Sequence, residues 1–265
     1  MKIFILTGQS NSLGTTSDPK ESDITPGKDP LDGKIPFFWA NRSTRAGDGV
    51  AVLYDDSGGK ILTLRAQKGE GENPLFWGPE ISFGRTLASR GENNFMIVKA
   101  SRGGGGNSYW LKGNSDDHMY RHVVDIVKDA IKALKKKSSN SSTSMSYEIA
   151  ALLYVQGESD SAAEAAESGE RLQKLAENLR KDLPHAKRMK VVIGGIAAAG
   201  KERDVVRSQQ SALPAMYPTF KYIDTLDLRS QLMSDGLHFD KQAKLAIGQR
   251  MAKTWLEWQK KKIKK

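Results

Sequence analysis

Short apolar segments recur along the chain, and patterns typical of helices lie between them. Four segments are continuously apolar rather than alternating, which is typical of parallel strands that are buried on both faces. They are Ile3–Leu6, Phe95–Val98, Ile149–Val155 and Val191–Ile196, with Tyr222–Thr225 as a weaker fifth. Helical periodicity covers about Glu80–Arg90, Met119–Lys136, Ala162–Asp182, Asp204–Tyr217 and Asp240–Lys261. This order predicts an α/β fold, a three-layer α/β/α sandwich with a mostly parallel five-stranded sheet.

The length of 265 residues suits one domain, which we expect to span residues 1–265. Residues 12–79 are rich in Gly, Pro, Asp and Ser, and contain possible short strands at Ala51–Tyr54 and Ile61–Leu64. An irregular segment of this length is usually functional or wrongly assigned. We expect a long insertion after the first strand that shapes a substrate crevice; a surface excursion without a function is the alternative.

The composition excludes several classes of protein and site. The chain has no cysteine, which excludes disulfides, a thiol nucleophile and thiolate metal ligands. No segment approaches the roughly 18 apolar residues that a membrane-spanning helix requires, so we expect no membrane partner. The first residues lack the charged and apolar regions of a signal peptide, so we expect none in the chain as given. A secreted or periplasmic location would require a leader that has been removed, and the compartment stays undetermined.

The net charge of +10 is concentrated in Lys135–Lys137 and in a basic tail over residues 260–265. Lysine runs of this kind are usually solvated surface. No helix-turn-helix or RNP-type motif accompanies the charge, so we expect no nucleic-acid partner.

The first apolar run leads directly into Gly8-Gln9-Ser10-Asn11. In open α/β sheets, ligands bind in the crevice at the carboxyl ends of the strands. A serine at such a strand end is a candidate nucleophile if the chain also supplies a base and donors for an oxyanion.

His238 is the best candidate for that base among four histidines. It lies in a turn-like segment before the last helix, three residues after Asp235, so that one tight turn brings the carboxylate to the imidazole. Asp240 is expected to cap the helix that follows. The other histidines, His118, His122 and His185, are expected on the surface, with a metal site at the first two as the alternative.

Two polar segments follow the second and third strands. Arg102 and the glycines at 103–106 form a loop whose backbone N–H groups can approach a ligand closely, although a flexible linker is the alternative. A phosphate loop is not indicated, because no Gly-Lys-Ser/Thr sequence follows. After the third strand, Gln156 is a possible donor to an oxyanion or a sugar hydroxyl. Glu158 could orient His238, bind substrate or support the loop.

In combination, these segments resemble the SGNH hydrolases, and most closely the branch of sialate O-acetylesterase-like proteins and carbohydrate esterase family six acetylxylan esterases. The segments that carry the resemblance are Gly8–Asn11, Lys99–Gly104, Gln156–Asp160 and Asp235–His238, with Gly78–Gly84 as a further match. They occur in the family's order over nearly the whole chain. The implied fold is the SGNH or flavodoxin-like sandwich.

The resemblance implies a catalytic triad with Ser10 as nucleophile, His238 as general base and Asp235 as the acid that orients it. Glu158 is the alternative acid. The implied reaction is hydrolysis of an O-acetyl ester on a carbohydrate, which requires no metal and no organic cofactor.

The family's oxyanion donors correspond to the backbone N–H of Ser10, that of Gly103 or Gly104, and the side chain of Gln156. In the wider superfamily an asparagine stands at this last position, where this chain has Gln156.

Substrate contacts are expected from Gln9, Asn11, Arg102, Trp110 and Glu158. Aromatic side chains such as Trp110, and also Trp39, Trp77 and Tyr109, are candidate platforms for sugar rings, with core packing as the alternative.

The leading substrate is acetylxylan or a related polysaccharide. The alternatives are O-acetylated sialic acid, whose carboxylate would favour a clamp by Arg102, and a small acyl ester. A carbohydrate-binding module without turnover is the non-enzymatic alternative.

Overall fold

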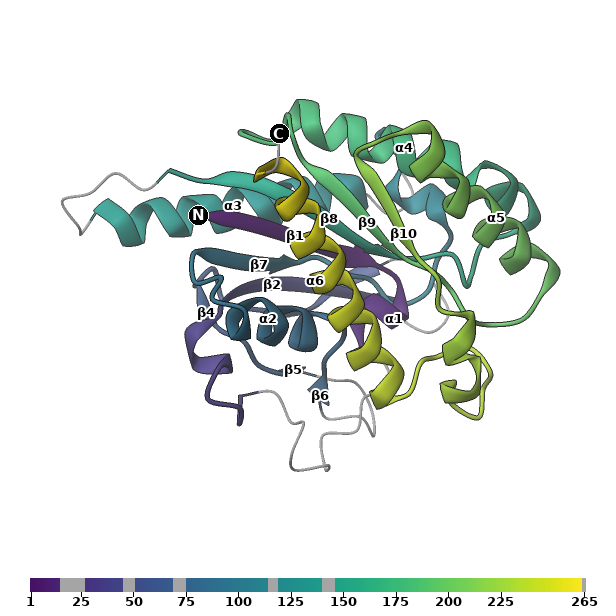
Figure 1. The fold of residues 1–265 in the computed structure, drawn as a ribbon, viewed down its shortest axis with the longest axis horizontal. Coiled ribbons are helices and arrows are strands. Elements are labelled where there is room, and N and C mark those ends of the chain that lie inside the picture. The colour runs from purple at the N-terminus through teal and green to yellow at the C-terminus, as the bar shows by residue number, and fades with distance from the viewer. Residues whose placement is uncertain (15–26, 45–50, 69–74, 114–118, 140–145, 264–265) are drawn as a thin grey trace.

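The computed structural model describes residues 1–14, 27–44, 51–68, 75–113, 119–139 and 146–263. An eight-stranded sheet forms its centre (Figure 1), and seven of the strands follow the order β10-β9-β8-β1-β7-β2-β3. Six of them are parallel to one another: β1 (Lys2–Gly8), β2 (Pro36–Thr44), β7 (Phe95–Lys99), β8 (Glu148–Val155), β9 (Lys190–Gly194) and β10 (Phe220–Ile223). The five expected strands are therefore all present, in a mostly parallel sheet.

The three additional strands of the sheet come from the long insertion, and two of them coincide with the possible short strands expected there. β2 extends the parallel sheet beside β7, and β3 (Ala51–Asp56) and β4 (Leu62–Thr63) pair with β2 in antiparallel fashion. β2 was missed because its short apolar stretch follows a proline inside a Gly- and Pro-rich region. Its Phe37 and Phe38 are both buried, in the cores on opposite faces of the sheet. β5 (Gln67–Lys68) and β6 (Leu75–Phe76) form a separate two-stranded ribbon.

Helices cover both faces of the sheet, as the three-layer prediction requires. One face packs against α2 (Glu80–Ser89) and α6 (Lys241–Ile263), which cross in front of the strands in Figure 1. The other face packs against α3 (Met119–Ser139), α4 (Ala162–Asp182) and α5 (Lys201–Met216). The last turn of α6 includes residues that were expected to form the basic tail, whose residues 264 and 265 lie outside the described ranges.

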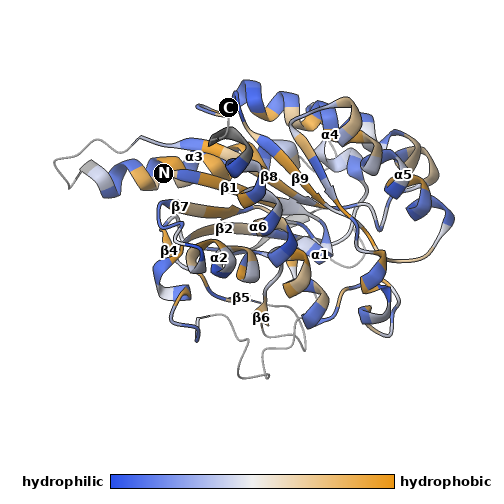
Figure 2. Cartoon of the chain, in the orientation of Figure 1, coloured by the Kyte–Doolittle hydropathy of each residue, from blue (hydrophilic) through white to orange (hydrophobic). Residues whose placement is uncertain are grey.

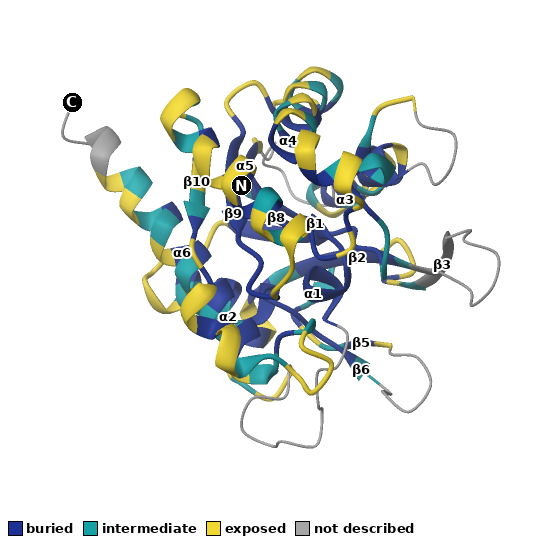
Figure 3. Ribbon diagram, turned by 90° about the vertical axis from the view of Figure 1, so that its right-hand side faces the viewer, coloured by how far each residue is buried: buried dark blue, intermediate teal, exposed yellow. Residues whose placement is uncertain are grey.

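The central strand β1 explains how the two cores arise. Ile3 and Ile5 point to the α3–α5 side, whereas Phe4 and Leu6 point to the α2–α6 side, as the period of two along a strand dictates. All four are fully buried, and each such side chain contributes about 1.5–3 kcal/mol by its removal from water. Figure 2 shows the apolar colour concentrated in the strands, and Figure 3 shows the exposed residues on the outward sides of the helices.

Local capping fixes where two of the helices begin. The side chain of Ser161 accepts a hydrogen bond from the backbone N–H of Glu164 in a reciprocal capping box at the start of α4. Asp240 accepts from the N–H of Ala243 at 2.8 Å and so caps α6, as expected.

Of the helices that the structure describes, none combines the length and the apolar character needed to cross a membrane. Within the same residues, no group of His, Asp and Glu side chains is placed to hold a metal ion.

Candidate active site

The candidate nucleophile Ser10 lies at a tight junction between β1 and the one-turn helix α1 (Ser10–Leu13). Gly8 has a φ of 144°, and a Cβ atom at this position would collide with the carbonyl oxygen of Val155 in β8. The next residue, Gln9, donates its N–H to the same carbonyl at 3.0 Å. The chain therefore turns sharply against β8 and presents Ser10 at the carboxyl edge of the sheet, where 5% of the residue is exposed.

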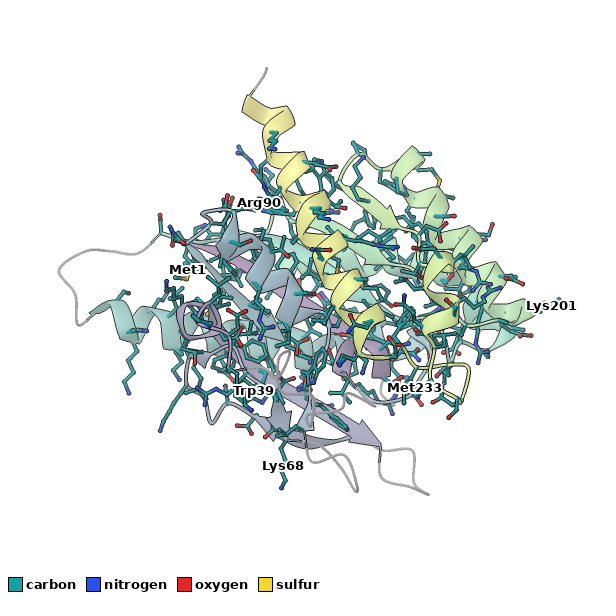
Figure 4. The ribbon with its side chains drawn as sticks, turned by 60° about the horizontal axis from the view of Figure 1, so that its bottom comes forward. Met1, Trp39, Lys68, Arg90, Lys201 and Met233 are labelled. Carbon is teal, nitrogen blue, oxygen red and sulfur yellow. The ribbon has the colours of Figure 1, made fainter. Side chains whose placement is uncertain are left out.

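His238 and Asp235 meet Ser10 from the segment between the 3-10 helix η3 (Leu226–Gln231) and α6. Met233, which Figure 4 labels, lies on this segment. The Nε2 atom of His238 is 2.8 Å from Ser10 Oγ, and its Nδ1 atom is 2.7 Å from Asp235 Oδ2. The other carboxylate oxygen of Asp235 accepts the backbone N–H groups of Leu237 at 2.8 Å and His238 at 3.0 Å.

The electrostatics of this turn favour a charged Asp235. Partial burial raises the pKa of its carboxyl group, but the hydrogen bonds from the backbone and ring of His238 and from Leu237 outweigh that effect and lower the pKa to about 2. An ionised carboxylate at Nδ1 keeps the proton there and leaves Nε2 free to accept one from the serine. The hydrogen bonds therefore have the connectivity that general-base activation of a serine requires.

Glu158, the alternative acid, lies nearby in a different environment. Burial raises the pKa of its carboxyl group to about 7. Its Oε1 atom accepts a 2.6 Å hydrogen bond from Asn11 Nδ2, and no hydrogen bond joins it to His238 in the part of the chain that the structure describes. Asn11 in turn donates to the carbonyl of Leu237 at 3.3 Å and accepts from the N–H of Phe239 at 2.9 Å. Glu158 thus reaches the His238 segment only through Asn11.

In the glycine loop after β7, Gly103 and Gly104 are the alternative backbone donors to an oxyanion. The N–H of Gly103 donates to the carbonyl of Arg42 at 3.1 Å. The N–H groups of Gly104 and Ser10 have no hydrogen-bond acceptor among the described residues. Gly104 has a φ of 64°, and the loop is fixed next to β1 because Arg102 N–H donates to the carbonyl of Gly8 at 3.0 Å. Ser10 and Gly104 are therefore the better pair of available backbone donors.

Gln156, the expected side-chain donor, is fully buried at the end of β8. Its Nε2 atom donates to Asp160 Oδ1 at 2.5 Å, and its Oε1 atom accepts from the hydroxyl of Tyr154 at 3.0 Å. Both ends of the amide thus have protein partners, and a role at the oxyanion stays a prediction.

All five residues expected to contact substrate are buried, and two of them, Asn11 and Glu158, bind each other as described above. Trp110 is 2% exposed and donates from Nε1 to Thr7 Oγ1 at 3.0 Å. Arg102 is 1% exposed, with its guanidinium 3.9 Å above the ring centre of Tyr109. Gln9 is fully buried and donates to Ser159 Oγ at 3.1 Å. These contacts correct the expectation of a sugar platform at Trp110 and of a carboxylate clamp at Arg102.

The other candidate platforms for sugar rings are Trp39, Trp77 and Tyr109. Trp39 and Trp77 are buried core residues, and Trp39 Nε1 donates to Asp55 Oδ2 at 2.7 Å. Tyr109 is half-buried beneath the guanidinium of Arg102. Their burial corrects the expectation of exposed ring faces at the two tryptophans.

The remaining histidines do not join the site. His122 is buried, contrary to expectation, and Nε2 lies 2.8 Å from the carbonyl oxygen of Ala40. Burial lowers the pKa of its imidazole to about 4. His185 is exposed, as expected, and His118 lies outside the described residues.

Sequence reasoning missed two groups of residues around Ser10. Arg203 in α5 donates from Nε to the carbonyl of Glu158 at 3.1 Å. Lys99 and Glu80 form a fully buried ion pair with an N–O distance of 2.8 Å. Lys99 and Glu80 belong to segments that carry the family resemblance, whereas Arg203 does not. In both groups the partners are far apart in the sequence, and such a pairing leaves no local signal in a single sequence.

Comparisons with known proteins identify the family and the fold of the chain. The family model described as carbohydrate esterase, sialic acid-specific acetylesterase matches residues 1–257. The comparison with curated proteins gives no match. Solved structures match over most of the chain.

A protein from Arabidopsis thaliana is 23% identical, with a TM-score of 0.65 and coverage of 97% of this chain and 98% of that chain. NanS is 14% identical, with a TM-score of 0.57 and coverage of 98% and 97%. A carbohydrate acetylesterase from Xanthomonas citri is 16% identical, with a TM-score of 0.59, and covers 94% of this chain and 54% of its own. At these identities the structures support the fold alone.

The family match confirms the resemblance to sialate O-acetylesterase-like SGNH hydrolases, and the solved structures confirm the α/β/α fold. Because the family model covers nearly the whole chain, the chain belongs to the carbohydrate esterase family of sialic acid-specific acetylesterases and is a carboxylic ester hydrolase.

Proposed function

We propose that the chain removes O-acetyl groups from a carbohydrate through an acetyl-enzyme on Ser10. The observation that carries this proposal is the continuous pair of hydrogen bonds, 2.8 Å from Ser10 Oγ to His238 Nε2 and 2.7 Å from His238 Nδ1 to Asp235 Oδ2. Three residues from opposite ends of the chain meet in the order that serine activation needs.

In the first half of the reaction, Ser10 Oγ attacks the acetyl carbonyl carbon while its proton moves to His238 Nε2. The N–H groups of Ser10 and Gly104 stabilise the negative oxygen of the tetrahedral intermediate. The bond between the acetyl carbon and the sugar oxygen then breaks, and His238 returns the proton to the sugar hydroxyl.

In the second half, His238 takes a proton from water, whose oxygen attacks the acetyl-serine. Acetate leaves, and Ser10 Oγ recovers its proton from His238. Asp235 stays ionised throughout and stabilises the imidazolium that forms in both halves.

Two acetylated carbohydrates compete as the substrate of this reaction. The description of the matched family makes O-acetylated sialic acid the first substrate to test. Acetylxylan remains the competing substrate, because the buried Arg102 does not supply the carboxylate clamp that a sialic acid would favour. Membership in an esterase family favours turnover over a binding module of the same fold.

The test compares p-nitrophenyl acetate hydrolysis by the wild type and by Ser10→Ala. We expect the variant to lose activity to near background, and full activity in a folded Ser10→Ala would overturn the mechanism. Acetate release from O-acetylated sialic acid and from acetylated xylan, at matched acetyl concentration, then distinguishes the two substrates by kcat/KM.

A further inference from the structure

Two buried lysines hold the carbonyl end of α1, the helix that begins with Ser10. Lys99 Nζ donates to the carbonyl of Leu13 at 2.8 Å, to Gln67 Oε1 at 2.7 Å and to Glu80 Oε1 at 2.8 Å. Lys244 Nζ donates to the carbonyl of Gly14 at 3.4 Å. Lys99, Glu80 and Lys244 are fully buried, and we call these three residues the α1 support cluster.

The cluster is assembled from three separate parts of the fold. Lys99 ends β7, Glu80 begins α2, and Lys244 lies in the first turns of α6; these elements are labelled in Figure 1. The backbone around Glu80 packs against the same helix end, because a Cβ atom at Gly14 would collide with the backbone of Trp77. The carbonyl end of α1 is therefore fixed from several directions.

Stability alone does not account for this arrangement. Burial lowers the pKa of Lys99, and burial together with the charge of Lys99 lowers that of Lys244 to about 7. A buried ion pair is often matched or exceeded in stability by apolar side chains of the same volume. Groups whose pKa values are shifted by burial and by a specific charged partner cluster at functional sites.

The position of Ser10 depends directly on this helix end. α1 contains a single turn, in which the N–H of Gly14 donates to the carbonyl of Ser10 at 2.8 Å. A shift of the carbonyl end therefore moves Ser10 as well. His238 is held by the hydrogen bonds of its own turn to Asp235 as well as by the Asn11 side chain. A movement of the carbonyl end of α1 therefore changes the distance between Ser10 Oγ and His238 Nε2. A misplacement of about 1 Å in such a pair can cost about 100-fold in rate.

We propose that Lys99 and Lys244 are positioning residues for Ser10, with Glu80 holding Lys99 in place. They bind the last carbonyls of α1 and thereby fix the serine at hydrogen-bond distance from His238. The inference rests on the proposed role of Ser10 as nucleophile.

The first test is the double variant Lys99→Met/Glu80→Gln, which removes the ion pair with little change in volume. We expect a folded protein whose kcat for p-nitrophenyl acetate falls at least tenfold with KM unchanged. Labelling of Ser10 by a fluorophosphonate probe should slow by a similar factor. The matched control is Arg85→Met/Asp32→Asn, which removes a largely buried ion pair outside the site and should leave kcat unchanged.

The second test is Lys244→Met, which replaces a buried ammonium group by an apolar chain of similar length. We expect a melting temperature equal to or above that of the wild type and a kcat several-fold lower. A residue with a purely structural role would not give a more stable but slower enzyme. If the double variant does not fold, this variant decides the question.

Wild-type kcat and labelling rate in folded Lys99→Met/Glu80→Gln, or in Lys244→Met, would overturn the inference. Ser10→Ala separates this failure from a failure of the proposed function. An inactive Ser10→Ala beside fully active lysine variants rejects the positioning role alone, whereas an active Ser10→Ala rejects the nucleophile.

Discussion

Asn11 and Glu158 are joined by a 2.6 Å hydrogen bond at the point where the nucleophile turn, the end of β8 and the His238 segment meet. Asn11 uses its remaining capacity to bind the backbone on both sides of His238, at the carbonyl of Leu237 and the N–H of Phe239. One amide side chain therefore links Ser10, its neighbour in sequence, to a histidine 228 residues away.

Replacing Asn11 by alanine should slow catalysis without removing any reacting group. The backbone around His238 loses both contacts with the Asn11 side chain, so the imidazole no longer stays at 2.8 Å from Ser10 Oγ. We expect kcat to fall by about 10- to 100-fold, which corresponds to about 1.4–2.8 kcal/mol in activation free energy. Steady-state kinetics with p-nitrophenyl acetate measures the change.

The exposed Asn94, which precedes β7, supplies the matched control. Asn94→Ala should retain wild-type kcat. Equal kcat in Asn11→Ala and the wild type would show that the His238 segment holds its position without this side chain.

The two candidate acids should differ sharply when their charge is removed. Asp235→Asn replaces the carboxylate at His238 Nδ1 by an amide, and we expect a loss in kcat of about 10²- to 10⁴-fold. Glu158→Gln keeps an oxygen that can accept from Asn11, so we expect a loss below about tenfold. Pre-steady-state acetylation by p-nitrophenyl acetate is the appropriate measurement. A larger loss in Glu158→Gln would assign Glu158 as the acid.

The candidate catalytic residues could be predicted from the sequence because the patterns that indicate them lie within short segments. Ser10 follows a buried strand directly, and Asp235 lies one turn before His238, so that their contact depends on a short segment. The five parallel strands and the helices around them were predicted for the same reason. β2 was missed, because a strand inside a Gly- and Pro-rich segment is recognised only through its neighbour β7.

Exposure was the property that the sequence predicted least well. Trp110 and Arg102 flank the glycine loop in sequence, which suggested contact with substrate, but both point into the interior. Burial depends on which distant elements cover a side chain, and Thr7 and Tyr109 become the partners only after folding. The α1 support cluster escaped prediction in the same way.

The stability of the protein should depend on pH through Glu158. Its pKa is about 7 in the folded state and near its ordinary value of 4.5 when unfolded. Between these values the folded state binds the proton that the unfolded state has released, so the contribution of Glu158 to stability is lost as the pH rises from about 4.5 to 7. The contribution is about 3 kcal/mol at most, from 1.36 kcal/mol for each pKa unit.

Urea unfolding of the wild type and Glu158→Gln, at several pH values between 4.5 and 7, measures this contribution. The variant should lack the contribution of Glu158, because its amide does not titrate. Asp235 and Lys244 titrate outside this range, below about 4 and above about 7. His122 titrates within it and with the opposite sign, because burial lowers its pKa to about 4 and the unfolded state then binds the extra proton. His122 is present in both proteins, so the difference between their profiles reports Glu158. Parallel pH profiles for the wild type and the variant would contradict the assignment.

Because Trp110 is buried, its replacement should lower the stability of the protein without weakening substrate binding. Trp110→Phe removes the 3.0 Å hydrogen bond to Thr7 Oγ1 and part of the packing against Tyr154. We expect a loss of about 1–3 kcal/mol in unfolding free energy, from the smaller side chain and the lost hydrogen bond. The hydroxyl of Thr7 keeps its 2.6 Å hydrogen bond to the carbonyl of Ala100. The KM for an acetylated carbohydrate should not change, because the ring is inside the protein. A higher KM at unchanged stability would instead restore Trp110 as a platform for the sugar.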